Sequence, residues 1–183
     1  MKHEIIIAGF GGQGVLSMGK ILAYSGIMQD KEVTWMPSYG PEMRGGTANV
    51  TVILNDHKIS SPILNRYDIV IVLNQQSMDK FEDKVKPGGL LLYDPNGITR
   101  FPERKDITVC SIAAADESAK LGNSKAFNMI VLGALLKLAP MVTMENVIKG
   151  LKKSIPERNH HLIPMNEEAI KIGMEKVKVL NSI

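Results

Sequence analysis

Residues 4–14 join an apolar, β-branched run to a glycine-rich turn, and this junction limits the folds that the chain can adopt. Residues 5–7 are three consecutive isoleucines without polar alternation, which is typical of a strand buried on both faces of a parallel sheet. The following residues, 9–15, read GFGGQGV and contain the spacing G-x-G-x-x-G. A loop of this kind connects a strand to a helix, and its backbone N–H groups can hold a pyrophosphate. The junction therefore predicts an α/β fold with a candidate anion-binding loop.

Strand and helix patterns alternate through much of the chain, and the part after residue 112 is mostly helical. We expect a three-layer, Rossmann-like α/β fold with a mostly parallel sheet, a β-hairpin insertion and a helical C-terminal part. In the hairpin, residues 57–60 return antiparallel to the strand 48–54 across a turn at Asn55-Asp56. The other expected strands are 3–8, 32–36 (ended by Pro37), 69–74, 90–93 and 107–112 (the last), and the expected helices are 13–29, 75–85, 113–121, 125–139, 143–153 and 165–180.

Two expected helices have distinct apolar sides. In the first, Val15, Met18, Leu22 and Ile27 share the side that packs on the core. In the last, an amphipathic stripe of apolar residues packs on the core or on a partner subunit. The stripe consists of Ile170, Met174, Val177 and Leu180.

Four loops follow the ends of expected strands, at residues 9–14, 37–46, 74–75 and 94–96. In open α/β sheets, ligands bind outside the carboxyl ends of the strands. We therefore expect these four loops to lie together at the carboxyl edge of the sheet.

Composition excludes several classes of protein. The chain has 183 residues, 44% hydrophobic and 22% charged, which suits one globular domain. Its net charge is +3 and the basic residues are dispersed, so we expect no nucleic-acid partner. No apolar run reaches the length of a membrane span and no signal peptide is visible, so we expect a cytoplasmic protein without membrane contact. The one cysteine, Cys110, suits a reducing compartment and excludes an iron–sulfur cluster held by four cysteines of this chain.

The glycine loop lacks a feature that dinucleotide sites share. Such sites have an acidic residue at the carboxyl end of the second strand, where it binds the ribose. Here that strand ends at Met36 before Pro37, and its only carboxylate, Glu32, stands at the opposite end. The sequence therefore favours a general anion site or a purely structural loop over a nicotinamide site.

Other candidate residues remain open or indicate packing. Arg44 follows Glu42 in the loop 37–46, where its guanidinium can clamp an anion or form a surface salt bridge with Glu42 or Asp68. The adjacent histidines 160 and 161 have no metal-ligand spacing, and Cys110 is expected to be a buried apolar filler. We expect no catalytic residue and no metal ligand in this chain.

The glycine loop and the loop 37–46, which reads PSYGPEMRGG, together form a specific pair of motifs. The chain resembles the gamma subunit of 2-oxoacid:ferredoxin oxidoreductases, of the 2-oxoglutarate or branched-chain type. Residues 86–89 before a strand that ends at Tyr93-Asp94 are similar to the family, as are Asn128-Met129 before residues 132–134. The spacing of Asn166, Ala169 and Gly173 also fits. The resemblance implies one gamma-type domain over residues 1–183.

The resemblance also implies a place in an enzyme complex. These enzymes oxidatively decarboxylate a 2-oxoacid to its acyl-CoA with thiamine diphosphate, magnesium and iron–sulfur clusters, and they reduce ferredoxin. The resemblance implies alpha and beta subunits, with a ferredoxin-like delta subunit in some complexes, and those subunits hold the cofactors. This subunit is expected to cover the coenzyme A site and to be inactive alone. The candidate contacts for coenzyme A or for partner subunits are Gly9, Gly11, Gly12, Gln13, Gly14, Ser38, Tyr39, Glu42, Arg44, Gly45 and Gly46.

Two competing hypotheses remain at this point. One is a stand-alone NAD(P)-binding Rossmann oxidoreductase, which the glycine spacing supports and the missing acidic residue weakens. The other is a purely structural adaptor subunit whose loops touch only protein. The sequence does not name the 2-oxoacid, because the specificity pocket is expected to lie in other chains.

Overall fold

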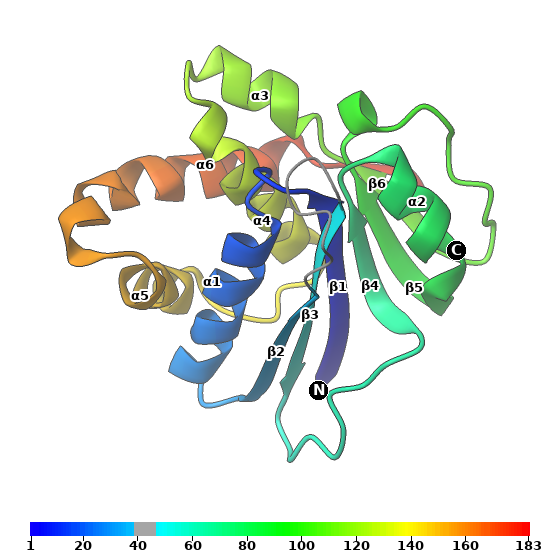
Figure 1. The fold of residues 1–183 in the computed structure, drawn as a ribbon, viewed down its shortest axis with the longest axis horizontal. Helices are drawn as coiled ribbons and strands as arrows, with labels where there is room; N and C mark the ends of the chain where they lie inside the picture. The colour runs from blue at the N-terminus through cyan, green and yellow to red at the C-terminus, as the bar shows by residue number, and fades with distance from the viewer. Residues whose placement is uncertain (39–46) are drawn as a thin grey trace.

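A seven-stranded sheet forms the centre of the computed structural model, which describes residues 1–38 and 47–183 (Figure 1). The strand order across the sheet is β2-β3-β1-β4-β5-β6-β7. The strands are β1 (Lys2–Phe10), β2 (Glu32–Ser38), β3 (Thr47–Asn55), β4 (Tyr67–Val72), β5 (Val85–Tyr93), β6 (Thr108–Ser111) and β7 (Lys178–Asn181).

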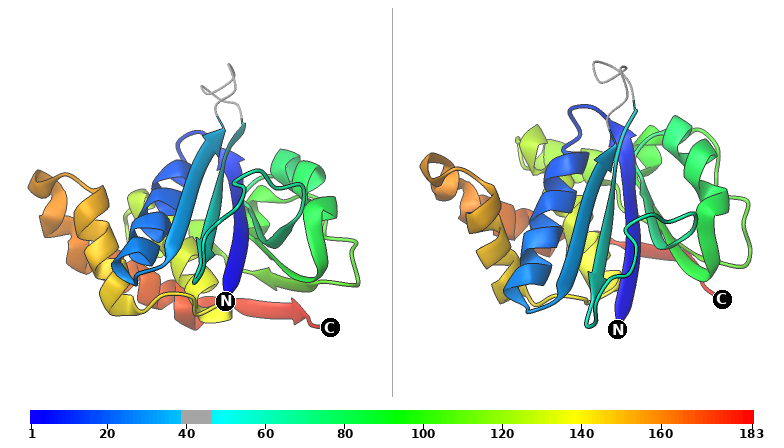
Figure 2. Two further views of the ribbon diagram at one scale, coloured as in Figure 1. Left: turned by 90° about the horizontal axis from the view of Figure 1, so that it is seen from below. Right: turned by 60° about the horizontal axis from the view of Figure 1, so that its bottom comes forward.

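Helices cover both faces of this sheet, so the expected α/β fold with a helical C-terminal part is confirmed (Figure 2). Helices α1, α4, α5 and α6 contribute to the larger of two hydrophobic clusters, whereas α2 contributes to the smaller cluster on the opposite face. The helices are α1 (Val15–Met28), α2 (Gln75–Phe81), α3 (Ala114–Lys120), α4 (Phe127–Leu138), α5 (Met144–Ser154) and α6 (Ile163–Lys176), and short 3₁₀ turns occupy 82–84, 95–97, 124–126 and 157–162.

The isoleucine run forms the central strand β1, as its lack of polar alternation predicts. Successive side chains of a strand point to opposite faces. Ile5 and Ile7 accordingly belong to the larger cluster, while Ile6 and Ala8 belong to the smaller one. Because both faces of β1 are covered by helices, no position in this run needs a polar side chain.

The sheet is mixed, whereas the sequence suggested a mostly parallel one. Strands β1, β4, β5 and β6 form three parallel pairs in succession. The other three pairs among the described strands are antiparallel: β2 with β3, β3 with β1, and β6 with β7. The parallel strands lie at the centre, and the antiparallel pairs extend the sheet toward both sides.

The predicted hairpin has the wrong partner strand. Strand β3 pairs antiparallel with β2, from Glu32 opposite Asn55 to Ser38 opposite Asn49, and residues 57–60 form no strand. Asp56 accepts hydrogen bonds from the Lys31 ammonium at 2.5 Å and from the amino terminus, so the turn after β3 is fixed to the end of the sheet. Pro37 lies inside β2, which tolerates a residue without an N–H because β2 is an edge strand.

Two other expected boundaries are also wrong. Helix α6 ends at Lys176, and residues 178–181 form an additional edge strand, so Val177 and Leu180 do not belong to a helical stripe. Strand β5 begins at Val85, at the expected end of the helix 75–85 and before the expected strand start at residue 90. Its left-handed residue Gly88, with φ 79°, lies where the pairing with β4 shifts register.

Helices α4 and α6 cross at backbone contact distance. A Cβ atom added to Gly133 would lie 1.9 Å from the carbonyl oxygen of Ile170, and one added to Gly173 would lie 1.9 Å from that of Ile130. Only glycine permits this approach at these two positions. The crossing fixes the position of α4, whose first turn contributes to the site described next.

Candidate functional site

The glycine loop follows β1 at the carboxyl edge of the sheet, as predicted. The Gln13 side chain holds it in shape, because its Oε1 accepts a hydrogen bond from Phe10 N at 2.6 Å and its Nε2 donates to Leu73 O at 3.2 Å. A Cβ on Gly9 would lie 2.5 Å from Gln13 Oε1, so this arrangement requires glycine there. Gln13 therefore braces the loop through both polar atoms of its side chain.

Two glycines of the loop have left-handed backbone conformations, with φ 95° at Gly12 and 73° at Gly14. Gly14 precedes the first residue of α1 and contacts α4, because Asn128 Nδ2 donates to Gly14 O at 3.3 Å. A Cβ on Gly14 would lie 2.4 Å from Asn128 Nδ2, whereas a Cβ on Gly12 would meet no atom within 4 Å. Gly14 thus closes a contact between two helices, and Gly12 faces open space.

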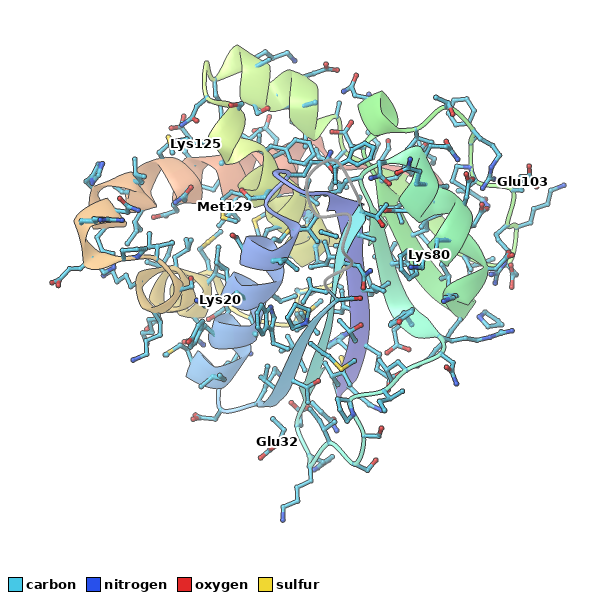
Figure 3. The ribbon with its side chains drawn as sticks, viewed as in Figure 1. Lys20, Glu32, Lys80, Glu103, Lys125 and Met129 are labelled. Atoms are coloured by element: carbon cyan, nitrogen blue, oxygen red, sulfur yellow. The ribbon has the colours of Figure 1, made fainter. Side chains whose placement is uncertain are left out.

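A pocket of about 530 Å³ lies beside this loop. The loop forms one wall, α3 a second, and the start of α4 with the preceding 3₁₀ turn a third. Lys125 is the one charged residue among the described residues that line it, and Figure 3 labels this side chain near the start of α4. The lining residues are Gly12, Gln13, Gly14, Ala115, Ser118, Ala119, Ser124, Lys125, Phe127 and Asn128.

The electrostatics of the pocket favour an anion. Helix α1 begins beside it at Val15, and no side chain caps the first backbone N–H groups of that helix. Helix α4 also begins at the pocket, after the 3₁₀ turn that contains Lys125. The backbone N–H groups of Lys125 and Phe127 are already bonded within that turn. The uncapped start of α1 and the Lys125 ammonium group therefore meet in a pocket without a lining carboxylate, an arrangement that suits a phosphate or a carboxylate ligand.

Asp94, at the carboxyl end of β5, positions the α3 wall. Its two carboxylate oxygens accept hydrogen bonds from Asn96 N at 2.8 Å and from Ala115 N at 2.9 Å. Burial raises the pKa of the Asp94 carboxyl, and the backbone donors oppose that effect. The expectation that residues 94–96 reach this edge is confirmed, and Asp94 serves there as a brace between β5 and α3.

Asn74, after β4, serves as a helix cap at the same edge. Its Oδ1 accepts a hydrogen bond from Ser77 N at 2.7 Å at the start of α2. Three of the four predicted loops, 9–14, 74–75 and 94–96, therefore lie at the carboxyl ends of strands. Of the fourth, Pro37 and Ser38 belong to β2, and residues 39–46 lie outside the described part of the chain.

The strand order separates this site from a dinucleotide site. In a dinucleotide fold, the second strand lies beside the first and its acidic end residue reaches the ribose. Here β3 lies between β1 and β2 and runs antiparallel to both. The residue opposite Phe10 is Thr47, so no carboxylate stands at that position in β3.

The predicted site residues fall into three groups. The first group is the glycine loop. In it Gly9 is buried, Gly11 is exposed, and Gly12, Gln13 and Gly14 line the pocket. Ser38 is exposed at the end of β2, opposite Asn49. The remaining predicted contacts, Tyr39, Glu42, Arg44, Gly45 and Gly46, lie outside the described residues.

Sequence reasoning missed the other two walls of the pocket. In the sequence, Lys125 is only the first residue of the expected helix 125–139, and Asn128 contributes only to the resemblance. The available signal was that both residues begin a helix with an apolar body, as Val15 does after the glycine loop. A helix start with a lysine beside it is a plausible anion contact, but only the fold brings it to the glycine loop.

Other candidate groups take structural positions. Cys110 is buried as expected, and burial raises the pKa of its thiol to about 11. His160 Nε2 lies 3.0 Å from the carbonyl oxygen of Lys152, which ties the 3₁₀ turn to α5. Across residues 1–38 and 47–183, no cluster of His, Cys, Asp and Glu side chains could hold a metal ion. No helix in the same residues has the length and apolar character needed to cross a membrane.

Residues 4–176 match the family described as "Pyruvate ferredoxin/flavodoxin oxidoreductase". The chain belongs to this family. Its sequence is 37% identical over 163 residues to the 2-oxoglutarate synthase subunit KorC of Methanocaldococcus jannaschii, covering 86% of each chain. It is 34% identical over 172 residues to the ketoisovalerate oxidoreductase subunit VorA of Methanothermobacter thermautotrophicus, covering 94% of this chain. The match spans only 36% of that VorA chain.

Solved structures of this family share the fold. The gamma subunit of a keto/oxoacid ferredoxin oxidoreductase from Geobacter sulfurreducens superposes with a TM-score of 0.82 at 29% sequence identity. The alignment covers 96% of both chains. The mixed sheet and its helical layers are therefore the fold of this family.

Proposed function

We propose that this chain is the gamma subunit of a multi-subunit 2-oxoacid:ferredoxin oxidoreductase, formed by residues 1–183 as one gamma-type domain. The observation that carries the proposal is the match along nearly the whole chain to the family and to a solved gamma subunit. The complex would oxidatively decarboxylate a 2-oxoacid, join the acyl group to coenzyme A and reduce ferredoxin. The similarity to both 2-oxoglutarate and ketoisovalerate subunits supports the class of substrate without choosing its side chain.

In this proposal, thiamine diphosphate, magnesium and the iron–sulfur clusters belong to alpha, beta and, where present, delta subunits. The residues of this chain do not fit those groups. Cluster ligation requires several thiolates, and the chain has one cysteine, which is buried. The described residues also lack a carboxylate and histidine set for a metal. We therefore assign no catalytic residue to this chain and expect it to be inactive alone.

Coenzyme A is the ligand that the chain's own residues fit best. The molecule carries phosphate groups, whose oxygens accept hydrogen bonds from backbone N–H groups and from ammonium groups. The pocket is lined by the glycine loop, which leads into the uncapped start of α1, and by Lys125. In this proposal the glycine loop and Lys125 contact phosphate, and Ser38, Tyr39, Glu42, Arg44, Gly45 and Gly46 contact coenzyme A or the adjoining subunit.

Gentle affinity purification of the chain from its native cells, under anaerobic conditions, tests the subunit assignment. We expect subunits that bind thiamine diphosphate and iron–sulfur clusters to co-purify in a fixed ratio, from the cytoplasmic fraction. A panel of 2-oxoacids applied to that complex would identify the substrate. Recovery of the chain alone, or tight binding of NAD to it, would contradict the assignment and favour the stand-alone oxidoreductase.

The variant Arg44→Ala distinguishes a coenzyme A contact from a purely structural adaptor. If Arg44 contacts coenzyme A, the variant complex should assemble normally and show an increased KM for coenzyme A. If the loop touches only protein, assembly should weaken while the KM of the assembled fraction stays unchanged. Arg158→Ala is a matched control, because Arg158 is exposed in the 3₁₀ turn before α6, away from the pocket lining.

A further inference from the structure

A second hollow lies on the outer side of α1, away from the glycine loop. It has a volume of about 260 Å³ and opens between α1 and the edge strand β2. We call it the α1/β2 surface, and it is lined by Lys20, Ala23, Tyr24, Ile27, Val33 and Trp35. Figure 1 shows α1 and β2 adjacent at this side of the sheet.

The apolar side chains of this surface are incompletely covered by the chain itself. Ile27, which the helical pattern assigned to the core side of α1, is 50% exposed, and Trp35 is 38% exposed. Val15, Met18 and Leu22 on the same helix are buried, so α1 packs on the core without Ile27. An exposed apolar centre that includes a tryptophan is typical of a protein interaction site.

Charged groups of opposite sign lie at the two ends of this surface. Lys20 marks one end, and α1 rises by roughly 12 Å from Lys20 to its last residue, Met28. Asp30 follows the helix and Glu32 begins β2, so both carboxylates lie at the other end, where Figure 3 labels Glu32. Lys20, Asp30 and Glu32 are exposed, and none of them forms an ion pair with a residue in the described part of the chain.

This order of charges is complementary to itself under two-fold symmetry. In a two-fold interface both copies use the same surface, and residue i of one copy contacts residue j of the other while j contacts i. An axis through the centre of the α1/β2 surface, perpendicular to α1, turns the second copy end for end. Lys20 of each copy then lies opposite Asp30 and Glu32 of the other, and the apolar side chains of both copies meet between them. The result is an apolar centre with a charged rim, as is typical of protein–protein interfaces.

This contact is formed by packed side chains and not by pairing of strands. β2 is an edge strand, but Pro37 within it has no N–H to donate to a further strand. The opposite edge strand, β7, also has exposed apolar side chains, Val179 and Leu180. Its one charged residue is Lys178, so β7 has no carboxylate to pair with the lysine of a second copy. The charges therefore favour the α1/β2 surface as the place where two copies meet.

We propose that the α1/β2 surface binds a second copy of this chain in a two-fold dimer, with Lys20 of each copy opposite Asp30 and Glu32 of the other. The inference does not depend on the proposed function. Where both hold, the complex contains two copies of this subunit joined at this surface. The pocket beside the glycine loop lies outside the contact, because no residue that lines it also lines the α1/β2 surface.

Sedimentation velocity of the purified full chain tests the dimer, and two charge variants test its geometry. We expect the wild type to dimerise. Lys20→Glu should weaken dimerisation at least tenfold, because it places like charges opposite one another, and Glu32→Lys should weaken it less, because Asp30 keeps one opposite charge. An equimolar mixture of the two variants should recover dimers, since each supplies the charge that the other lacks. A variant that had only lost its fold would not be rescued by mixing, so failure of the mixture to dimerise would contradict this pairing.

Thiol labelling identifies the surface that the dimer covers, because Cys110 is the only cysteine and is buried. Ile27→Cys places one thiol at the centre of the surface, and Ile63→Cys places one in the loop before β4, where Ile63 is 74% exposed. We expect maleimide to label position 27 at least tenfold more slowly in the dimer than in the diluted monomer, with labelling at 63 unchanged. Equal labelling of position 27 in dimer and monomer would overturn the proposal, as would a wild-type chain that stays monomeric at its highest soluble concentration.

A further variant tests the apolar centre and separates the other possible occupants. Ile27→Glu should weaken dimerisation at least tenfold, while Ile63→Glu should not, with circular dichroism confirming the fold of both. If position 27 is protected only in a complex with other subunits, the surface belongs to one of those subunits and the dimer is ruled out. Co-purification of cofactor-binding subunits tests the subunit assignment separately, so the failure of one proposal leaves the other standing.

Discussion

The two edges of the sheet use charged side chains in opposite ways. At the amino edge, the buried Glu4 pairs with Lys2 and Lys86, and Lys86 also lies 2.7 Å from Asp68. Asp68 in turn accepts a hydrogen bond from Glu4 N at 2.9 Å. At the carboxyl edge, Lys125 lines a pocket that contains no lining carboxylate.

The charged residues at the amino edge therefore contribute to stability, and those at the carboxyl edge are available for binding. The amino-edge network joins β1, β4 and β5, and its two carboxylates and two ammonium groups neutralise one another. These charged groups therefore stabilise the contact between the strands. The carboxyl edge instead places the glycine loop and Lys125 around an open pocket. Substitutions at the first edge should therefore change the free energy of unfolding without changing ligand affinity, whereas those at the second should change ligand affinity, with or without a change in stability. Four predictions test this division.

The largest effect is expected from Gly14→Ala at the carboxyl edge. The new Cβ would lie 2.4 Å from Asn128 Nδ2, in a backbone conformation with φ 73°. We expect the KM for coenzyme A of the assembled enzyme to increase at least tenfold, with a loss of about 2 kcal/mol in the free energy of unfolding. Gly88→Ala is the matched control, because it shares the left-handed conformation, meets no neighbouring atom and does not line the pocket. An equal KM effect from both variants would contradict the role of the Asn128 contact.

A smaller effect is expected from Lys125→Ala. Loss of one charge-assisted hydrogen bond to phosphate should increase the KM for coenzyme A by about tenfold. The free energy of unfolding should not change, because no ion pair of Lys125 within the described residues is lost. Lys120→Ala on α3 is the control, since Lys120 pairs with Glu117 at 2.7 Å and does not line the pocket. An unchanged KM for Lys125→Ala would remove this lysine from the ligand site.

At the amino edge, Glu4→Gln should give the reverse result. Glu4 is buried, but its partners Lys2 and Lys86 have side chains that are 47% and 37% exposed, so solvent weakens the pairing. We expect the free energy of unfolding at pH 7 to decrease by about 1 kcal/mol, measured by urea titration. The KM for coenzyme A should match the wild type. A change in KM would show that the two edges are coupled through β1.

The smallest expected effect is the pH dependence of the difference in unfolding free energy between the wild type and Glu4→Gln. Burial alone would raise the pKa of Glu4, but hydrogen bonds from Lys2 and Lys86 outweigh it and leave the pKa below its ordinary value of 4.5. The ionised carboxylate therefore stabilises the folded chain above pH 4.5, and this contribution is lost as pH falls through the lowered pKa. The difference in unfolding free energy between wild type and Glu4→Gln should decrease between pH 5 and the acid transition. A constant difference would contradict the ion pairing.

The sequence predicted those parts of the fold that depend on local patterns. The isoleucine run fixed β1 as a doubly buried strand, and the glycine spacing fixed the turn into α1. The errors arise where distant pairing decides the structure. Pro37 looks like a strand end, yet it belongs to β2 because an edge strand tolerates proline. Residues 178–181 continue a helical pattern, yet they extend the sheet because the edge of β6 is available to pair.

The candidate site, like the fold, could be predicted only where local sequence patterns determine it. The glycine loop can be predicted from the sequence, because a single backbone turn determines the spacing of its glycines. Lys125 stands at the start of an expected helix, but no local pattern places it or Ala115 beside the loop, since α4 and α3 reach the loop only through the Gly133–Gly173 crossing and the Asp94 brace. Residues that are more than a hundred positions apart in the sequence form this pocket. The periodicity of apolar residues predicts helices and strands, but it does not predict which distant elements come into contact.

The larger hydrophobic cluster also sets an order of events during synthesis. Ile5, Ile7 and Met18 belong to it together with Ile130 and Ile170, which leave the ribosome more than a hundred residues later. At about 5–20 residues per second, the apolar side of β1 and α1 waits roughly 6 to 30 seconds for α4 and α6 to cover it. The nascent N-terminal half of this chain is therefore the stage at which chaperones have the most apolar surface to bind.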